Sequence, residues 1–284
     1  MATILDGKAV SAHVKAEVKR EVEALAKQGV SVSLAVILVG DDPASHTYVR
    51  NKEKACAEAG IRSKTYRLPA DTTEQALLAL VETLNADKAV NGILCQLPLP
   101  KGLNEAAVIA AVSPEKDVDA FHAVNVGRIM LGNYAFLPCT PAGIVELLDY
   151  YRIDPAGKRC VVIGRSNIVG KPMAMLLLHR DATVTVCHSK TEDLAAITKT
   201  ADILVAAVGK PRFVTADMVK PGAVVIDVGM DRDENGKLCG DVDFAAVEPK
   251  AACITPVPGG VGPMTIATLL KNTVTAAKLQ NGLR

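Results

Sequence analysis

The chain has 284 residues, which is more than one hydrophobic core usually serves and favours two domains. Hydrophobic residues make up 49% and aromatic residues only 3%, so we expect a core of aliphatic side chains, as in parallel sheets covered by helices. The net charge of +1 argues against a protein that binds nucleic acid or a membrane surface.

The cysteines and the N-terminal segment indicate a cellular compartment. The seven cysteines include no C-x-x-C pair and their number is odd, which predicts reduced, structural thiols. The opening residues, MATILDGKAV, lack the basic stretch and apolar core of a secretory signal, and no apolar run reaches the ~20 residues of a membrane span. We therefore expect a cytoplasmic protein without a membrane segment.

Strand and helix signals alternate along the first half of the chain. Asp6 is expected to cap the first helix, and Thr72 with Gln75 forms a capping-box pattern before a later one. This alternation is typical of a wound α/β domain. The expected elements are a strand at 3–5, a helix to about 27, a strand in SLAVILVG, a helix over 45–59, a strand over 64–68, a helix ending near 85 and a strand in GILCQLPLP.

The stretch from about 113 to 141 differs from its surroundings. Its prolines and glycines predict an irregular conformation. A polar segment of this length in a compact protein is expected to line a site or to join domains. Thr140 and Pro141 then predict a helix start, with the threonine as cap and the proline at the first helical position.

The alternation resumes at Arg159 and ends in a loop rich in glycine and proline. The expected elements are strands in RCVVIG, TVTVCHS, DILVAAVG and GAVVIDVG, a helix in GKPMAMLLLHRD and a last amphipathic helix after ITPVPGGVGP. We therefore expect the second half to be a second wound α/β domain, of the Rossmann-like type.

A glycine-containing turn between a strand and a helix, Gly164 to Gly170, is the candidate dinucleotide site. Glycine lets the backbone approach a phosphate, and a helix N-terminus presents unpaired N–H groups to an anion. The loop departs from G-x-G-x-x-G, because Ser166 replaces the second glycine and the last glycine comes one residue late. By the residues alone, an ordinary strand–helix turn remains an alternative.

The end of the next strand bears on the choice of cofactor. NAD sites usually carry an acid there that binds the ribose 2′-hydroxyl, whereas this strand ends in Cys187, His188, Ser189 and Lys190. Arg165, in the glycine loop, adds a cation, and a guanidinium with a hydroxyl favours a 2′-phosphate. The pattern predicts NADP, with His188 open to a structural interpretation.

Tyr48 and Lys52 stand four residues apart on an expected helix and share a face. A lysine enclosed by apolar groups is suited to proton transfer, and a neighbouring phenol can orient it. A solvated helix face is the alternative, since Glu53 and Lys54 follow. Tyr-x-x-x-Lys is also typical of short-chain dehydrogenases, but there it follows the cofactor loop, and here it precedes that loop.

Gln96 interrupts an apolar strand at its carboxyl end, where open α/β sheets place ligands. It is either a core amide bonded to backbone or a site residue that faces Lys52. Asp117 and Asp119, in KDVDAFH, are ordinarily solvated turn acids. We expect no metal site, because no matching cluster of histidines or cysteines accompanies them.

Together these motifs resemble the bifunctional methylenetetrahydrofolate dehydrogenase/methenyltetrahydrofolate cyclohydrolase family. The resemblance covers essentially the whole chain in the family's order, and PVPGGVGPMT is its most specific part. The shared motifs are TYVRNKEKACAEAGI, GILCQLPLP, KDVDAFH, CTPAGI, VVIGRSNIVGKPMAMLL and ITPVPGGVGPMTIATLL.

The resemblance implies a folate-binding catalytic domain over 1–120, a Rossmann-like NADP-binding domain over 121–262 and a C-terminal helix, 263–284, that returns to the first domain. It implies a catalytic centre of Tyr48, Lys52 and Gln96. The other residues that it implies are Tyr48, Asp119, Gly262 and Pro263 for the folate, Gly164, Arg165, Ser166 and Ser189 for NADP, and Met230 at its nicotinamide end.

The implied activity is oxidation of 5,10-methylenetetrahydrofolate with NADP, followed by hydrolysis of the methenyl product to 10-formyltetrahydrofolate. The hydrolysis needs proton transfers, and Lys52 is the candidate general acid–base group. The family also implies a homodimer. Two rival interpretations are another two-domain NADP dehydrogenase of the shikimate type and a non-catalytic NADP-binding protein of the same fold.

Overall fold

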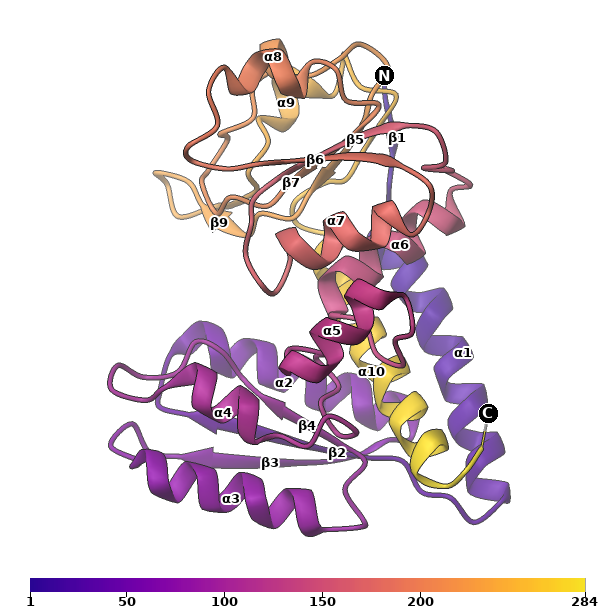
Figure 1. Cartoon of the computed structure of the whole chain (residues 1–284), viewed down its shortest axis with the longest axis vertical. Coiled ribbons are helices and arrows are strands. Elements are labelled where there is room, and N and C mark those ends of the chain that lie inside the picture. Colours follow the sequence, from indigo (N-terminus) through magenta and orange to yellow (C-terminus); the bar gives the residue numbers. More distant parts are fainter. Residues whose placement is uncertain (284) are drawn as a thin grey trace. The chain divides into compact units, whose positions relative to one another are not determined.

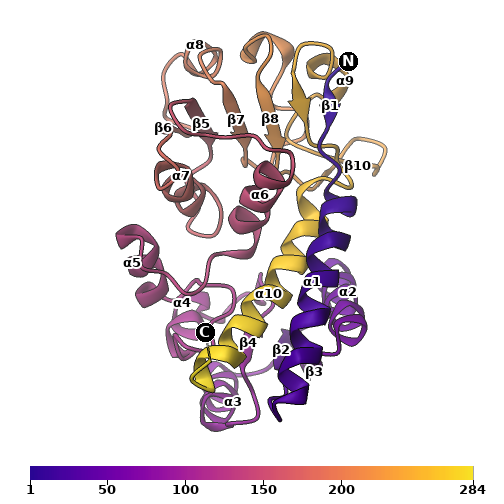
Figure 2. The same cartoon turned by 90° about the vertical axis from the view of Figure 1, so that its right-hand side faces the viewer.

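The computed structural model describes residues 1–283, which form two compact units (Figures 1 and 2). The six-stranded unit comprises 1–12 and 138–265, and the three-stranded unit comprises 13–137 and the residues from 266 onward. Of the three divisions, two thus fall within the first helix and the last helix, and the third lies between residues 137 and 138. We name each unit by its sheet.

The chain alternates strands and helices through both units. The helices are α1 (Gly7–Lys27), α2 (Pro43–Ala59), α3 (Glu74–Ala86), α4 (Glu105–Ala111), α5 (Ala123–Leu131), α6 (Cys139–Tyr150), α7 (Gly170–Leu178), α8 (Leu194–Thr198), η1 (Ala216–Met218), α9 (Phe244–Val247) and α10 (Val261–Gln280). The strands are β1 (Thr3–Ile4), β2 (Ser33–Val39), β3 (Arg62–Leu68), β4 (Gly92–Cys95), β5 (Arg159–Ile163), β6 (Thr183–Cys187), β7 (Ile203–Ala206), β8 (Val224–Asp227), β9 (Asp231–Arg232), β10 (Leu238–Cys239) and β11 (Cys253–Ile254).

The three-stranded unit is built on a parallel sheet in the order β3-β2-β4. Its central strand, β2, is buried along nearly its whole length, which explains the unbroken apolar run in the sequence. Ala35, Ile37 and Val39 form one core cluster with side chains of α3 and α4. Figures 1 and 2 both draw α2 and α3 on opposite sides of this sheet. The expected wound α/β domain is confirmed.

The six-stranded unit has an all-parallel sheet in the order β1-β11-β8-β7-β5-β6. From β5 onward the chain follows the doubly wound order 2-1-3-4-5, whose switch point lies between its first and third strands. The expected Rossmann-like fold is confirmed. The switch point therefore falls between β5 and β7, next to the glycine-containing turn.

The first residues of the chain belong to the six-stranded sheet because β1 pairs with β11, as Thr3 aligns with Cys253. The boundaries expected from sequence, at 120/121 and 262/263, fall before the points where chain contacts change, 137/138 and 265/266, and the first of them is well short of the observed division. The segment up to Leu137 stays with the three-stranded unit, where Asn272 of α10 donates to the carbonyl of Leu137 at 2.8 Å.

The C-terminal helix returns to the first half of the chain, as the sequence predicts. Lys278 of α10 pairs with Glu21 of α1 at 2.5 Å. Gln280 accepts from Asn91 at 3.1 Å and donates to the backbone carbonyl of the same residue at 2.9 Å. These polar contacts hold α10 against α1 and against the residue that directly precedes β4.

Helix caps confirm some sequence expectations and correct others. Asp6 accepts from the backbone N–H of Lys8 at 2.9 Å and so caps α1, as expected. The capping box at Thr72 and Gln75 is wrong: Thr73 is the cap of α3, and Thr72 bonds to the carbonyl of Pro69 instead. The two threonines are adjacent in sequence. The backbone turn before the helix determines which of them becomes the N-cap.

Two expectations for the middle of the chain are also wrong. The stretch expected to be irregular contains α5, which is capped by His122 and ends at Gly132. The helix α6 begins at Cys139 without a side-chain cap, because the hydroxyl of Thr140 bonds to that of Thr265 at 3.1 Å. Tertiary contacts, invisible in local sequence, override the local capping signal.

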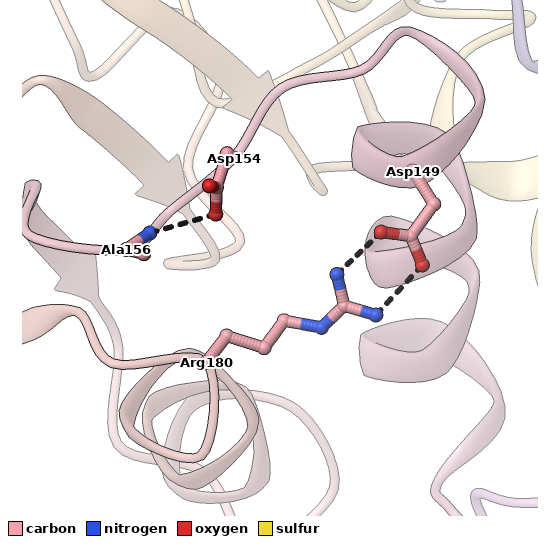
Figure 3. Close-up of polar contacts among 4 residues, drawn as sticks. All are labelled: Asp149, Asp154, Ala156 and Arg180. Atoms are coloured by element: carbon pink, nitrogen blue, oxygen red, sulfur yellow. Dashed lines mark hydrogen bonds and ion pairs between the residues drawn. The ribbon is translucent and has the colours of Figure 1, made fainter.

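Within the six-stranded unit, a double ion pair joins α6 to the turn that follows α7. Figure 3 shows the two terminal guanidinium nitrogens of Arg180 against the two carboxylate oxygens of Asp149. In the same view Asp154 accepts from the backbone N–H of Ala156 at 3.0 Å and shapes the loop before β5. These contacts help to fix α7, whose N-terminus lies beside the glycine-containing turn.

Candidate functional site

Lys52 and Gln96 lie in contact in the three-stranded unit. The ammonium of Lys52, on α2, donates to Oε1 of Gln96 at 3.0 Å. Gln96 follows β4 directly, and its own N–H extends the sheet by donating to the carbonyl of Ile37 at 2.9 Å. Its side-chain NH2 donates to the carbonyl of Leu97 at 2.6 Å, which turns the amide oxygen toward the lysine. Both side chains are half-buried.

Tyr48 stands one helical turn before Lys52 on α2. The helix is capped by Asp42, which accepts from the backbone N–H of Ser45 at 2.7 Å. Tyr48 is 38% exposed, and partial burial raises the pKa of its phenol. The spacing places Tyr48 and Lys52 on the same face of the helix.

Asp119 lines a pocket in the same unit. The lining also includes Cys95, at the end of β4, and Leu97 and Phe121. Burial raises the pKa of the Cys95 thiol to about 12, and the negative charge of Asp119 acts in the same direction. The thiol is therefore protonated at neutral pH, so Cys95 is not a nucleophile in this pocket.

The glycine-containing turn of the six-stranded unit has the shape that a phosphate site requires. Gly164 follows β5 with a φ of 128°, and a Cβ there would lie 2.2 Å from the carbonyl oxygen of Ala207. A Cβ on Gly170 would lie 2.2 Å from the carbonyl oxygen of Gly164. Only glycine fits at both positions, so the turn packs closely against the loop after β7 and leads directly into the N-terminus of α7, where unpaired N–H groups favour an anion.

Ser166 performs the capping role in this turn. Its hydroxyl oxygen accepts from the backbone N–H groups of Val169 and Gly170 at 3.2 and 3.3 Å. Both bonds use the oxygen as acceptor, so the hydroxyl hydrogen remains available to an anion. Arg165 and Ser189 are both exposed, the first in the turn and the second after β6.

The remaining residues expected at the site also lie in the six-stranded unit. Met230 follows β8 and is 44% exposed. A Cβ on Gly262 would lie 2.9 Å from the methyl carbon of Met230, so the start of α10 packs against this side chain. Pro263 stands in the first turn of α10, and its carbonyl accepts from the hydroxyl of Ser11 at 3.0 Å.

Sequence reasoning missed two buried aspartates at the carboxyl edge of the large sheet. Asp227, at the end of β8, accepts from the backbone N–H groups of Gly229, Asp241 and Val242 at 2.9–3.0 Å. Burial raises the pKa of Asp227 to about 7, although these three hydrogen bonds act to lower it. Asp241 accepts from the N–H groups of the loop after β7, at Val208 (2.6 Å) and at Lys210 (2.8 Å). The aspartate in the expected strand GAVVIDVG was the sequence signal that could have indicated Asp227.

The pair Asp117 and Asp119 does not behave as two solvated turn acids. Asp117 is buried and accepts from the backbone N–H of His122 and from the side chain of Asn125, both at 2.8 Å. Burial raises the pKa of its carboxyl. Within residues 1–283, no group of three or more histidines, cysteines and acids is placed to hold a metal ion.

The fold and the site define a two-domain α/β enzyme with a dinucleotide-type turn in one unit and a lysine–glutamine pair in the other. Residues 5–119 match the model of the tetrahydrofolate dehydrogenase/cyclohydrolase catalytic domain, and residues 138–281 match the model of the NAD(P)-binding domain of that family. The chain belongs to the tetrahydrofolate dehydrogenase/cyclohydrolase family.

Individual relatives agree with the family models. The chain is 60% identical to the bifunctional protein FolD of Acetivibrio thermocellus over 279 residues, which is 98% of each chain. It is 53% identical to the solved structure of the bifunctional FolD methylenetetrahydrofolate dehydrogenase/cyclohydrolase from Campylobacter jejuni, with a TM-score of 0.96 and coverage of 98% and 99%. It is 43% identical to the Trypanosoma brucei enzyme, solved with NADP cofactor and inhibitor, with a TM-score of 0.94 and 98% coverage of both chains.

Proposed function

We propose that this chain oxidises 5,10-methylenetetrahydrofolate to the methenyl form with NADP and hydrolyses that product to 10-formyltetrahydrofolate. The contact between Lys52 and Gln96 carries the proposal, because it places a polar pair at the carboxyl end of a parallel sheet. Family membership over essentially the whole chain supports both activities. The family match does not favour either rival interpretation, a shikimate-type dehydrogenase or a non-catalytic protein.

The six-stranded unit fits NADP. The close approach at Gly164 and the N-terminus of α7 suit the pyrophosphate, whose charge the exposed N–H groups would stabilise. Arg165, Ser166 and Ser189 would hold the 2′-phosphate, and Met230 would lie at the nicotinamide end. The cofactor, when bound, supplies the hydride acceptor.

The two reactions make different demands on the chain's own residues. Loss of a hydride from the methylene carbon leaves a cation stabilised by the adjacent nitrogens, so no residue has to abstract a proton. The protein's task in this step is to position the folate carbon. Asp119 binds the pterin ring, and Tyr48, Gly262 and Pro263 complete the folate contacts. Hydrolysis, in contrast, requires a proton to leave the attacking water and a ring nitrogen to gain one.

Lys52 is the group that moves these protons. Its ammonium already donates to Gln96, whose amide is fixed by the carbonyl of Leu97. The fixed amide oxygen holds the lysine nitrogen in one place, while Tyr48 orients it from the same helix face. General acid–base catalysis by such a positioned group contributes roughly 10²–10⁴-fold to a rate.

The substitution Lys52→Met tests this role. We expect the decay of methenyltetrahydrofolate absorbance to slow by at least about 100-fold, since the acid–base group is gone. Cofactor titration should give an unchanged affinity for NADP, because the residues proposed to hold it lie in the other unit. Lys54→Met is the matched control: this lysine lies on the same helix, is 76% exposed and faces Glu58. A retained hydrolysis rate in Lys52→Met would overturn the assignment.

We also infer a homodimer and a cytoplasmic location. Family membership supports the dimer, and a mass measured by light scattering would test it. All seven cysteines are free thiols, which supports a reducing compartment. As a separate observation, none of the helices within residues 1–283 is both long and apolar enough to cross a membrane.

A further inference from the structure

The acidic turn, which we define as residues 116–122, carries Asp119 and is fixed at its start to the small sheet. The backbone N–H of Ile93, on β4, donates to the carbonyl of Lys116 at 2.7 Å. Ile93 and Asp117 also form an isolated parallel bridge. The turn therefore begins as an extension of the sheet at the strand that leads to Gln96.

Asp117 holds the acidic turn from inside. Its carboxylate accepts from the backbone N–H of His122 and from the side chain of Asn125, so one oxygen joins both ends of the turn to α5. Asn125 is 1% exposed and also donates to the carbonyl of Pro114 at 2.9 Å. Ala120, which is fully buried, adopts a φ of 57°. A non-glycine residue keeps this conformation only where its surroundings impose it.

Asn272, on α10, holds the turn from the other side. Its side-chain NH2 donates to the carbonyl of Val118 and to that of Leu137, both at 2.8 Å. The residue is 7% exposed, and Val118 is fully buried. The carbonyl of Val118 belongs to the peptide that leads into Asp119, so this bond fixes the orientation of the backbone from which the carboxylate projects.

We propose that Asp117 and Asn272 are positioning residues that hold Asp119 in the geometry needed to bind the pterin ring of the folate. This inference rests on the proposed function, since it takes Asp119 as the folate contact. Asn272 thereby contributes to the folate site without touching the substrate, because its amide acts through the backbone of the acidic turn.

The substitution Asn272→Leu removes both donors and keeps the branched shape of the side chain. It removes the amide bond to a buried carbonyl at Val118 and to a half-buried one at Leu137, which frees the turn to shift. The pterin contact is the same in the ground state and in the transition state, so its loss should raise KM and spare kcat. Both reactions use the same ring, so the KM values for methylene- and methenyltetrahydrofolate should rise together.

The experiment measures both activities for Asn272→Leu, Asp119→Ala and the double variant. We expect Asn272→Leu to raise KM for both folates by about tenfold, with kcat within about twofold and NADP affinity unchanged. In the Asp119→Ala background, adding Asn272→Leu should change KM no further, because the residue that it positions is gone. If Asn272→Leu does not fold, Asn272→Ser is measured instead, since it removes the amide with a smaller polar side chain.

Gln280→Leu is the matched control on the same helix. Gln280 donates to the carbonyls of Asn91 and Glu115, outside the acidic turn, so its loss should lower stability and leave KM unchanged. An unchanged KM in a folded Asn272 variant overturns the proposal. So does an additive effect in the Asp119→Ala background, or an equal rise of KM in Gln280→Leu. If Asp119→Ala alone leaves KM unchanged, Asp119 does not bind the folate. This outcome tests the proposed function and is distinct from failure of the positioning role, which the Asn272 variants test.

Discussion

At the scale of single residues, the chemistry of the three-stranded unit depends on one fixed amide. Gln96 has its NH2 on the carbonyl of Leu97 and its oxygen on the ammonium of Lys52, so the direction of the amide is set by the chain itself. The lysine side chain can rotate about four bonds, and the hydrogen bond to this acceptor reduces the number of conformations that it adopts. The proposed acid–base group is therefore positioned before any substrate arrives.

Replacing Gln96 with Glu should separate the two activities. The new carboxylate would hold the lysine beside it in its ammonium form more strongly than the neutral amide does, so Lys52 would exchange protons less readily. We expect hydrolysis of methenyltetrahydrofolate to slow by about 100-fold and NADP affinity to stay unchanged. Stopped-flow absorbance of the methenyl form measures the first quantity, and fluorescence titration measures the second. Hydrolysis at the unsubstituted rate would show that the amide is not needed.

The choice of NADP over NAD should depend on Arg165. This guanidinium is exposed in the glycine-containing turn, where no acid competes for it at the end of β6. We expect Arg165→Gln to raise KM for NADP by about tenfold and to leave KM for NAD unchanged, because only NADP carries the 2′-phosphate. Arg159→Gln, exposed at the opposite end of β5, is the control. Equal kcat/KM for the two cofactors before substitution would contradict the assignment.

At the scale of elements, strands were easier to predict than the ends of helices. The apolar runs that become β2, β5, β7 and β8 are buried on both faces of parallel sheets, and composition alone reveals them. Cap positions depend on the backbone turn before the helix, which adjacent threonines do not distinguish. The helix α5 was missed because its nine residues are flanked by glycine, proline and aspartate, which suggest a loop.

The two threonines before α3 give a direct test of the observed cap. Thr73 accepts from the backbone N–H of Ala76 at 3.2 Å, whereas Thr72 donates to the carbonyl of Pro69 at 2.6 Å. We expect Thr73→Ala to lower the free energy of unfolding by about 1 kcal/mol, as loss of an N-cap does. Thr72→Ala should have a smaller effect, since it removes only a partly exposed turn contact. Urea unfolding of the two variants checks the order; the reverse order would return the cap to Thr72.

At the scale of the whole molecule, the sequence predicts two wound α/β units and a returning C-terminal helix, because periodicity and order of elements determine these. The exact division of chain contacts was not predictable, since it depends on β1 pairing with β11 across 250 residues of sequence. The polar network of the site was not fully predictable from sequence either. The spacing of Tyr48 and Lys52 is local and visible in the sequence, but Asn272 contacts the acidic turn from a helix that is distant in sequence. The assignment of each ligand to its residues stays a prediction.

The buried Asp227 should make the stability of the six-stranded unit depend on pH. Its pKa is raised from 3.8 to about 7 by burial, so between these values the folded chain binds a proton that the unfolded chain has lost. This contribution is fully present below the unfolded pKa and is lost as the pH rises through the folded one. The free energy of unfolding should therefore fall by at most about 1.4 kcal/mol per pH unit over this window.

The substitution Asp227→Asn removes the titrating group and with it this part of the slope. Toward pH 8 the variant should lose less stability than the parent, because the amide carries no charge that burial disfavours, although its NH2 faces a backbone donor that the carboxylate accepts from. Urea unfolding between pH 4 and pH 8 compares the slopes of the parent and the variant. Asp243→Asn is the control, as this more accessible acid caps the short helix α9 nearby. If Asp227→Asn keeps the parent's slope, the buried carboxyl is not the group that titrates.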